Sequence, residues 1–112
     1  MSDSPPEMQA TAAEAEGLET LQRLFDAYQR ACFTERPPEF FALELTGEAG
    51  ELANLEKKAW KGKSIEPERF EDEAADVLIA LMNYCNARGV RLGPAVATKL
   101  REIERRRQAG TH

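Results

Sequence analysis

The chain has 112 residues, of which 42% are hydrophobic and 31% are charged, and its formal net charge at pH 7 is −5. A chain of this length is expected to form a single domain. It contains no apolar run of the roughly 18 residues that a membrane span needs, no secretory signal and no arginine- or lysine-rich arm, so we expect a cytoplasmic protein that binds neither a membrane nor nucleic acid.

The first half of the chain predicts a tail followed by two helices. Residues 1–15 show no periodic apolar pattern, and we expect them to form a flexible N-terminal tail. Apolar residues then recur at helical spacing and predict a helix over about residues 17–33. Pro37-Pro38 predicts a second helix that starts at residue 38, because proline fits a first turn, and that stops near Gly62.

The second half predicts two more helices. Ser64 or Glu66 can cap a third helix that starts near Pro67 and ends at Gly89. A fourth helix follows Gly93-Pro94, with apolar residues on one edge. No alternating strand pattern occurs, so the sequence predicts an all-α four-helix bundle over residues 16–108, followed by a short tail at 109–112.

Cysteine and histidine are scarce. Cys32 and Cys85 fall on the apolar sides of predicted helices, and we expect two reduced thiols in the core. His112 is the only histidine, and it is the last residue. This excludes catalytic triads, histidine zinc sites and the Glu-x-x-His di-iron bundle, and it leaves carboxylates and lysines as the main candidate catalytic groups.

Carboxylates gather on two of the predicted helices. At about 100° per residue, Glu48 lies roughly 40° and Glu51 roughly −20° from Glu44, so the three share one stripe of the second helix. Glu73 and Asp76 are three residues apart on the third helix, at the entrance to an apolar segment, residues 77–81, which we expect to be buried.

Two interpretations of these acids stay open at this point. They are either solvated helix faces, or four oxygen donors from facing helices that bind a divalent cation. Clustered carboxylates near an apolar surface repel one another and are costly to desolvate without a partner. Mg²⁺, or alternatively Mn²⁺, prefers such hard oxygen ligands.

The same residues resemble a known family. "GEAGELAN" followed by "EAADVLIAL" resembles the MazG-like all-α nucleoside triphosphate pyrophosphohydrolases, and most closely their dCTP-pyrophosphatase and phage-type MazG branches. The family pattern of Glu-x-x-Glu and Glu-x-x-Asp falls on Glu48, Glu51, Glu73 and Asp76, and the resemblance covers roughly residues 20–107.

The resemblance implies hydrolysis of a nucleoside triphosphate between its α and β phosphates, which releases a monophosphate and pyrophosphate. The four acids would hold Mg²⁺, and Glu48 or Glu51 would act on the attacking water. The implied substrate-binding residues are Asn54, Lys57, Trp60, Asn83 and Lys99. For Lys57 a solvated side chain is the alternative, and for Trp60 the alternative is hydrophobic packing.

The sequence also departs from that family. Ala80 stands where the dCTP branch has a tyrosine, and Asn83 and Tyr84 from the next turn are the candidates to compensate for it. Relatives often carry an asparagine near the lysine that corresponds to Lys99, but here the nearby positions are Val96, Ala97 and Ile103. These changes leave the metal ligands intact and leave base specificity open.

Two other functions compete with the enzyme. One is a non-catalytic nucleotide-binding module, and the other is a structural helical dimerisation domain. We expect a homodimer or homotetramer, because so short a chain has too little wall to enclose a nucleotide and because the family it resembles is oligomeric. We also expect Gly47 and Gly50 to let the second helix approach its neighbours closely.

Overall fold

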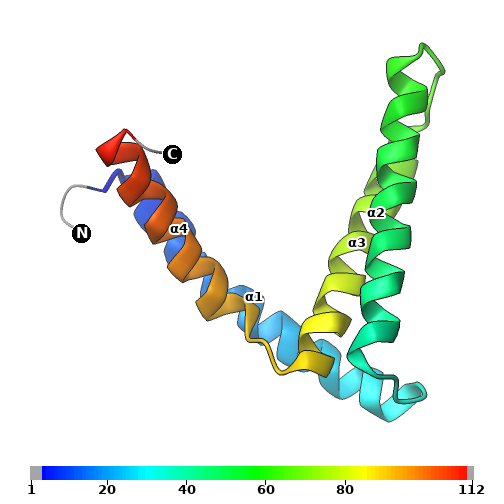
Figure 1. Cartoon of the computed structure of the whole chain (residues 1–112), viewed down its shortest axis with the longest axis horizontal. Helices are drawn as coiled ribbons and strands as arrows, with labels where there is room; N and C mark the ends of the chain where they lie inside the picture. Colours follow the sequence, from blue (N-terminus) through cyan, green and yellow to red (C-terminus); the bar gives the residue numbers. More distant parts are fainter. Residues whose placement is uncertain (1–3, 111–112) are drawn as a thin grey trace. The chain divides into compact units, whose positions relative to one another are not determined.

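The computed structural model describes residues 4–110, and within this range all regular secondary structure is helical (Figure 1). The four helices are α1 (Pro6–Cys32), α2 (Pro38–Trp60), α3 (Pro67–Arg88) and α4 (Leu92–Ala109). The expected class, four helices and no strand in the described part, is therefore confirmed. His112 lies outside the described residues.

Proline and glycine set the helix boundaries at the predicted places. Pro38 and Pro67 each begin a helix after a residue in extended conformation, where their missing N–H costs nothing. Gly89 ends α3 with φ of 78°, and its N–H donates to the carbonyl of Cys85. Only glycine adopts this left-handed conformation without strain.

The first helix is longer than predicted. It begins at Pro6 rather than near residue 17, so most of the expected tail is helical. The stretch is rich in alanine and glutamate, which favour a helix without producing an apolar stripe. Packing against the rest of the fold supplies the additional stability that a helix needs. Ala15 is buried where α1 meets α4, and a β-carbon built on Gly93 would lie 2.7 Å from the Ala15 carbonyl oxygen.

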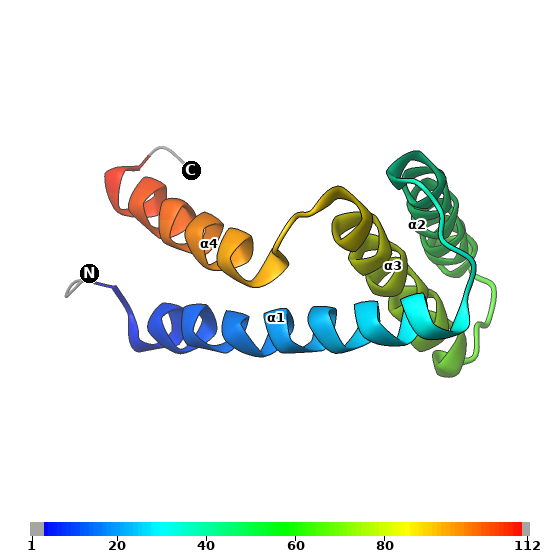
Figure 2. The same ribbon diagram turned by 90° about the horizontal axis from the view of Figure 1, so that it is seen from below.

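The helices pack in two units, which we describe separately. One unit contains α1 and α4, and the other spans Phe33–Gly89 and contains α2 and α3. In each unit the two helices run antiparallel and side by side (Figures 1 and 2).

In the first unit, a buried glutamine joins α1 to the start of α4. Gln22 donates from Nε2 to the carbonyl of Val90 at 2.7 Å, and its Oε1 accepts from the N–H of Leu92 at 2.9 Å. Arg91, between these two residues, donates to Glu19 on α1. Gln22 of α1 thus pairs the N–H of Leu92, which has no acceptor within α4 because it belongs to the first turn of that helix.

In the second unit, the buried side chains include Phe41 and Leu55 from α2 and Ala80 from α3. Two expectations about burial were wrong. Leu78 and Ile79, expected in a buried segment, are 40% and 41% exposed, and Cys32 is exposed whereas Cys85 is buried. Sequence periodicity identifies apolar residues but does not determine whether this chain covers them. None of the described helices combines the length and apolar character of a membrane span.

Candidate metal centre

Glu48 occupies a core position of α2. Phe41 and Leu55 lie seven residues before and after it, a spacing of about two turns that places all three on one face, and both of these neighbours are buried. On α3, Glu73 bears the same relation to buried Ala80. The apolar residues that join the two helices therefore bring these acids together.

Three of the four predicted ligands form one cluster. Glu48, Glu73 and Asp76 are each half-buried, and each offers a carboxylate oxygen such that the three atoms lie within 4.8 Å of one another. Three hard oxygen donors at this separation can hold a divalent metal ion.

Two oxygens of this cluster lack partners. Oε2 of Glu48 and Oε2 of Glu73 are both buried, and neither forms a hydrogen bond. Buried polar atoms in native proteins are almost always hydrogen-bonded, so such a pair calls for a specific explanation. A cation bound between the helices would satisfy both oxygens.

Electrostatics connect Glu51 to the same cluster. Burial raises the pKa of the Glu48 carboxyl, and the negative charges of Glu51, Asp76 and Glu73 raise it further. Burial also raises the pKa of Glu73, and the charge of Glu51 and a hydrogen bond with it add to this effect. Glu51 is itself exposed, so it stands at the solvent edge of the cluster.

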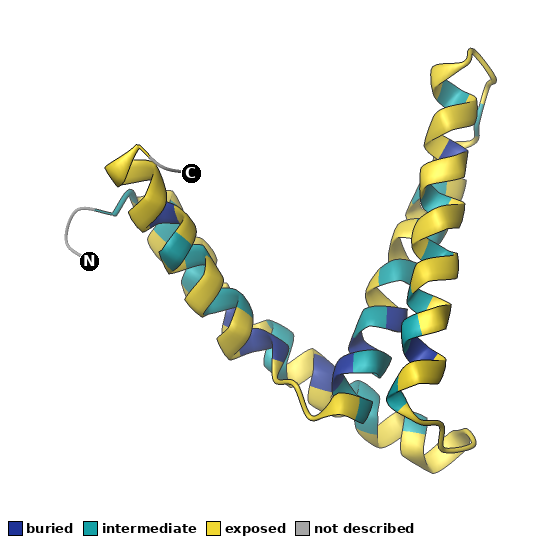
Figure 3. Cartoon of the chain, in the orientation of Figure 1, coloured by how far each residue is buried: buried dark blue, intermediate teal, exposed yellow. Residues whose placement is uncertain are grey.

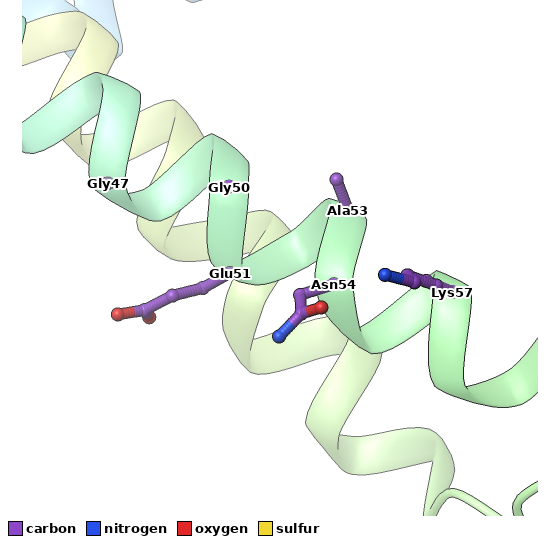
Figure 4. Close-up of a pocket in the computed structure, with 6 residues that line it drawn as sticks. All are labelled: Gly47, Gly50, Glu51, Ala53, Asn54 and Lys57. Atoms are coloured by element: carbon purple, nitrogen blue, oxygen red, sulfur yellow. The ribbon is translucent and has the colours of Figure 1, made fainter.

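Two predicted substrate-binding residues lie next to Glu51. Asn54 and Lys57 line a shallow, open hollow of about 460 Å³ on α2 together with Glu51, Gly47 and Gly50, and the side chain of Lys57 extends toward Asn54 (Figure 4). The hollow thus combines a carboxylate, an amide and an ammonium group.

The remaining predicted residues are more dispersed. Trp60, the last residue of α2, is 83% exposed, so the other described residues of the α2–α3 unit leave its side chain largely uncovered. Asn83 is half-buried on α3, seven residues beyond Asp76 and thus on the same face. Lys99 belongs to the α1–α4 unit, where its ammonium lies 3.4 Å from Oε2 of Glu102.

Glu102 was not among the predicted site residues. Besides Lys99, its carboxylate binds Arg106 at 2.6 Å, and the hydrogen bond from Lys99 together with the charge of Arg106 lowers its pKa. Glu102 lies three residues after Lys99 and four before Arg106, and this spacing in the sequence is what indicates ion pairs on one face of a helix.

No family model, no curated protein and no solved structure matches this chain.

Proposed function

We propose that this chain is a metal-dependent nucleoside triphosphate pyrophosphohydrolase. The observation that carries the proposal is a pair of buried oxygens without hydrogen-bond partners, one on Glu48 of α2 and one on Glu73 of α3, in a cluster that also includes Asp76. The resemblance of the two acidic motifs to the MazG-like family supports the same reaction.

The donor set fits a small, hard cation. All four acids supply oxygen and the cluster contains no sulfur or imidazole ligand, which favours Mg²⁺ or Mn²⁺ over zinc or copper. Glu48, Glu73 and Asp76 would hold the ion, with Glu51 at the solvent edge. When bound, the ion would neutralise phosphate charge and acidify a water molecule.

The protein's own groups then have distinct tasks. Glu51 is exposed at the edge of the cluster, so its carboxylate would orient a water molecule and accept its proton; Glu48 is the alternative base. Proton transfer to a carboxylate needs no histidine and no covalent intermediate.

Cationic and aromatic side chains would bind the substrate. Lys57, beside Asn54 in the hollow, supplies a positive charge for the phosphates, and Lys99 is a second candidate for that role. The exposed indole of Trp60, twelve residues past Glu48 on α2, offers a face on which a nucleobase can stack. Asn83, seven residues past Asp76 on the antiparallel α3 and therefore on the opposite side of the cluster, is the alternative contact for the base.

The test is release of pyrophosphate from a panel of ribo- and deoxynucleoside triphosphates, with Mg²⁺ or Mn²⁺ and with a chelator. We expect monophosphate and pyrophosphate in equal amounts and only with metal. Glu73→Gln should abolish release, whereas Glu71→Gln, which changes an exposed acid of the same helix, should not. Metal-dependent nucleotide binding without product would contradict the enzyme and identify a binding module instead.

A further inference from the structure

Arg69 lies in the first turn of α3, at a position where helices normally carry acids. The helix begins at Pro67, and Glu66 and Glu68 on either side of that proline are both acidic. A helix N-terminus carries a partial positive charge, so a cation there is unfavourable for the helix itself. Arg69 is exposed, as is most of the segment that joins α2 to α3 (Figure 3). The stability of α3 therefore does not explain the presence of this arginine.

Arg69 also has no acidic partner within the described part of the chain. No ion pair among residues 4–110 includes it, and the pairs that form all lie within the α1–α4 unit. Asp72 and Glu73 follow Arg69 by three and four residues, but a base that precedes its acid on a helix is the less favourable order. The guanidinium is thus available to an anion from outside the chain.

Arg69 shares one face of the α2–α3 pair with the edge of the acidic cluster. At about 100° per residue, Arg69 lies roughly −40° and Asp76 roughly −60° from Glu73 around α3. On α2, Glu51 lies roughly −60° from Glu48. The two helices run antiparallel (Figure 1), so a rotation of the same sign turns from their contact toward the same face of the pair. Arg69, Asp76 and Glu51 therefore lie on one face.

Positive charge lies on this face of α2 and α3 in one direction only. Arg69 is four residues before Glu73, which places it about 6 Å along α3 toward the loop that joins the two helices. Lys58, in the last turn of α2, lies on the same face in the same direction. In the other direction on α2, the nearest charged residue of this face is Glu44, one turn from the cluster. A polyanion held at the cluster is therefore attracted toward the loop and repelled at the opposite end.

We propose that Arg69 binds the β and γ phosphates of the substrate and so fixes its direction in the site. This assignment rests on the proposed function, in which the acidic cluster holds the phosphates beside the bond that is cleaved. The planar guanidinium donates two parallel hydrogen bonds to phosphate oxygens, and Lys58 adds a second positive charge. The two phosphates leave together as pyrophosphate, and Arg69 stabilises the charge that this leaving group gains.

The direction of the phosphates selects the contact for the base. With the γ phosphate toward the loop, the nucleoside extends the other way along the helix pair. Asn83 lies in that direction, on the same face and about 10 Å along α3 from Asp76. Trp60, at the loop end of α2, then lies beyond the phosphates rather than beside the base. Of the two candidates, Asn83 is therefore the residue that contacts the base.

Binding of inorganic tripolyphosphate tests the phosphate site without a nucleotide. Its dissociation constant in Mg²⁺ is measured by titration calorimetry for the wild type, Arg69→Gln, Arg69→Lys and Arg88→Gln, a control that removes an exposed charge from the other end of α3. Arg69→Gln should weaken binding about tenfold or more and Arg69→Lys about threefold, because lysine keeps the charge but loses the planar fork. Arg88→Gln should change it by less than about twofold. No binding by the wild type, or a loss in Arg69→Gln no larger than in Arg88→Gln, would overturn the proposal.

Kinetics on several nucleotides test the direction of the substrate. Arg69→Gln should lower kcat/KM for every nucleoside triphosphate by the same factor, because all of them carry the same phosphates, whereas Asn83→Ala should change the ratio between bases. A base-dependent loss in Arg69→Gln would contradict the assignment. Unchanged kinetics in Arg69→Gln with an active wild type would refute this inference alone. A wild type that cleaves no nucleotide, but binds tripolyphosphate through Arg69, would refute the proposed reaction and leave the phosphate site in place.

Discussion

Glu48 on α2 and Glu73 on α3 each hold one carboxylate oxygen away from solvent without a hydrogen-bond partner, and with Asp76 they place three ligand atoms within 4.8 Å of one another. The negative charges of Asp76 and Glu51 add to the effect of burial at both residues, so the metal-free cluster repels itself. Each prediction about this site follows from that repulsion or from its relief.

A divalent ion should stabilise the protein. Binding to the folded state alone raises the free energy of unfolding by about 2.7 kcal/mol when the free ion is at 100 times its dissociation constant. We expect Mg²⁺ and Mn²⁺ to raise Tm in a thermal melt without nucleotide. Asp76→Asn should remove most of the shift and Asp72→Asn, at an exposed position, should keep it; equal shifts in the two variants would exclude the cluster as the binding site.

Stability without metal should fall as pH rises. The pKa of Glu48 and of Glu73 is raised in the folded state, so the folded protein binds more protons than the unfolded chain between the ordinary carboxyl pKa and the raised one. Denaturant unfolding in chelator should therefore show stability lost as pH increases through this window. Glu48→Gln should flatten the slope, and an unchanged slope in that variant would argue against a strained cluster.

Glu104 should act in the opposite direction. It is buried on α4, where Arg107 donates to both of its oxygens at 2.6 and 2.7 Å, and this hydrogen bonding lowers its pKa. Its contribution to stability is thus present above the ordinary carboxyl pKa and is lost as pH falls through the lowered value. Glu104→Gln should destabilise the protein at neutral pH and reduce the acid sensitivity of its unfolding, whereas exposed Glu14→Gln should change neither.

Gly93 should not tolerate a larger residue. Its β-carbon would lie 2.7 Å from the Ala15 carbonyl oxygen and 2.7 Å from the β-carbon of Glu19, and both are atoms of α1 that a side-chain rotation cannot move away. Gly93→Ala should therefore cost about 1–3 kcal/mol in chemical denaturation. Gly17→Ala is the matched control, since open space surrounds that position, and it should stabilise by about 1 kcal/mol. Equal effects at the two glycines would show that α1 and α4 do not approach this closely.

Local chemistry accounts for what the sequence predicted correctly. Pro38, Pro67 and Gly89 set helix ends through their own backbone preferences, so three of the four helices begin and end close to the expected residues. The acidic cluster could also be predicted from the sequence, because three-residue spacing on a helix places two side chains on the same face. The structure brings Glu48, Glu73 and Asp76 together.

Tertiary contact accounts for what the sequence did not predict. The start of α1 was missed because its first turns have no apolar stripe, and the contact of Ala15 with Gly93 joins residues far apart in the chain. The exposure of Leu78 and Cys32 was missed because periodicity reports only that a face is apolar. The ion pair between Lys99 and Glu102 shows that a lysine expected to bind phosphate already has a carboxylate nearby.

The most direct measurement of the central claim is pyrophosphate release by the wild type and by Asp76→Asn, with nucleoside triphosphates and Mg²⁺ or Mn²⁺. We predict metal-dependent release by the wild type, with cleavage between the α and β phosphates. In Asp76→Asn the rate of release should fall by a factor of about 100 or more. No release from any nucleotide, or the same rate in Asp76→Asn, would contradict the assignment of this cluster as the metal centre of a pyrophosphohydrolase.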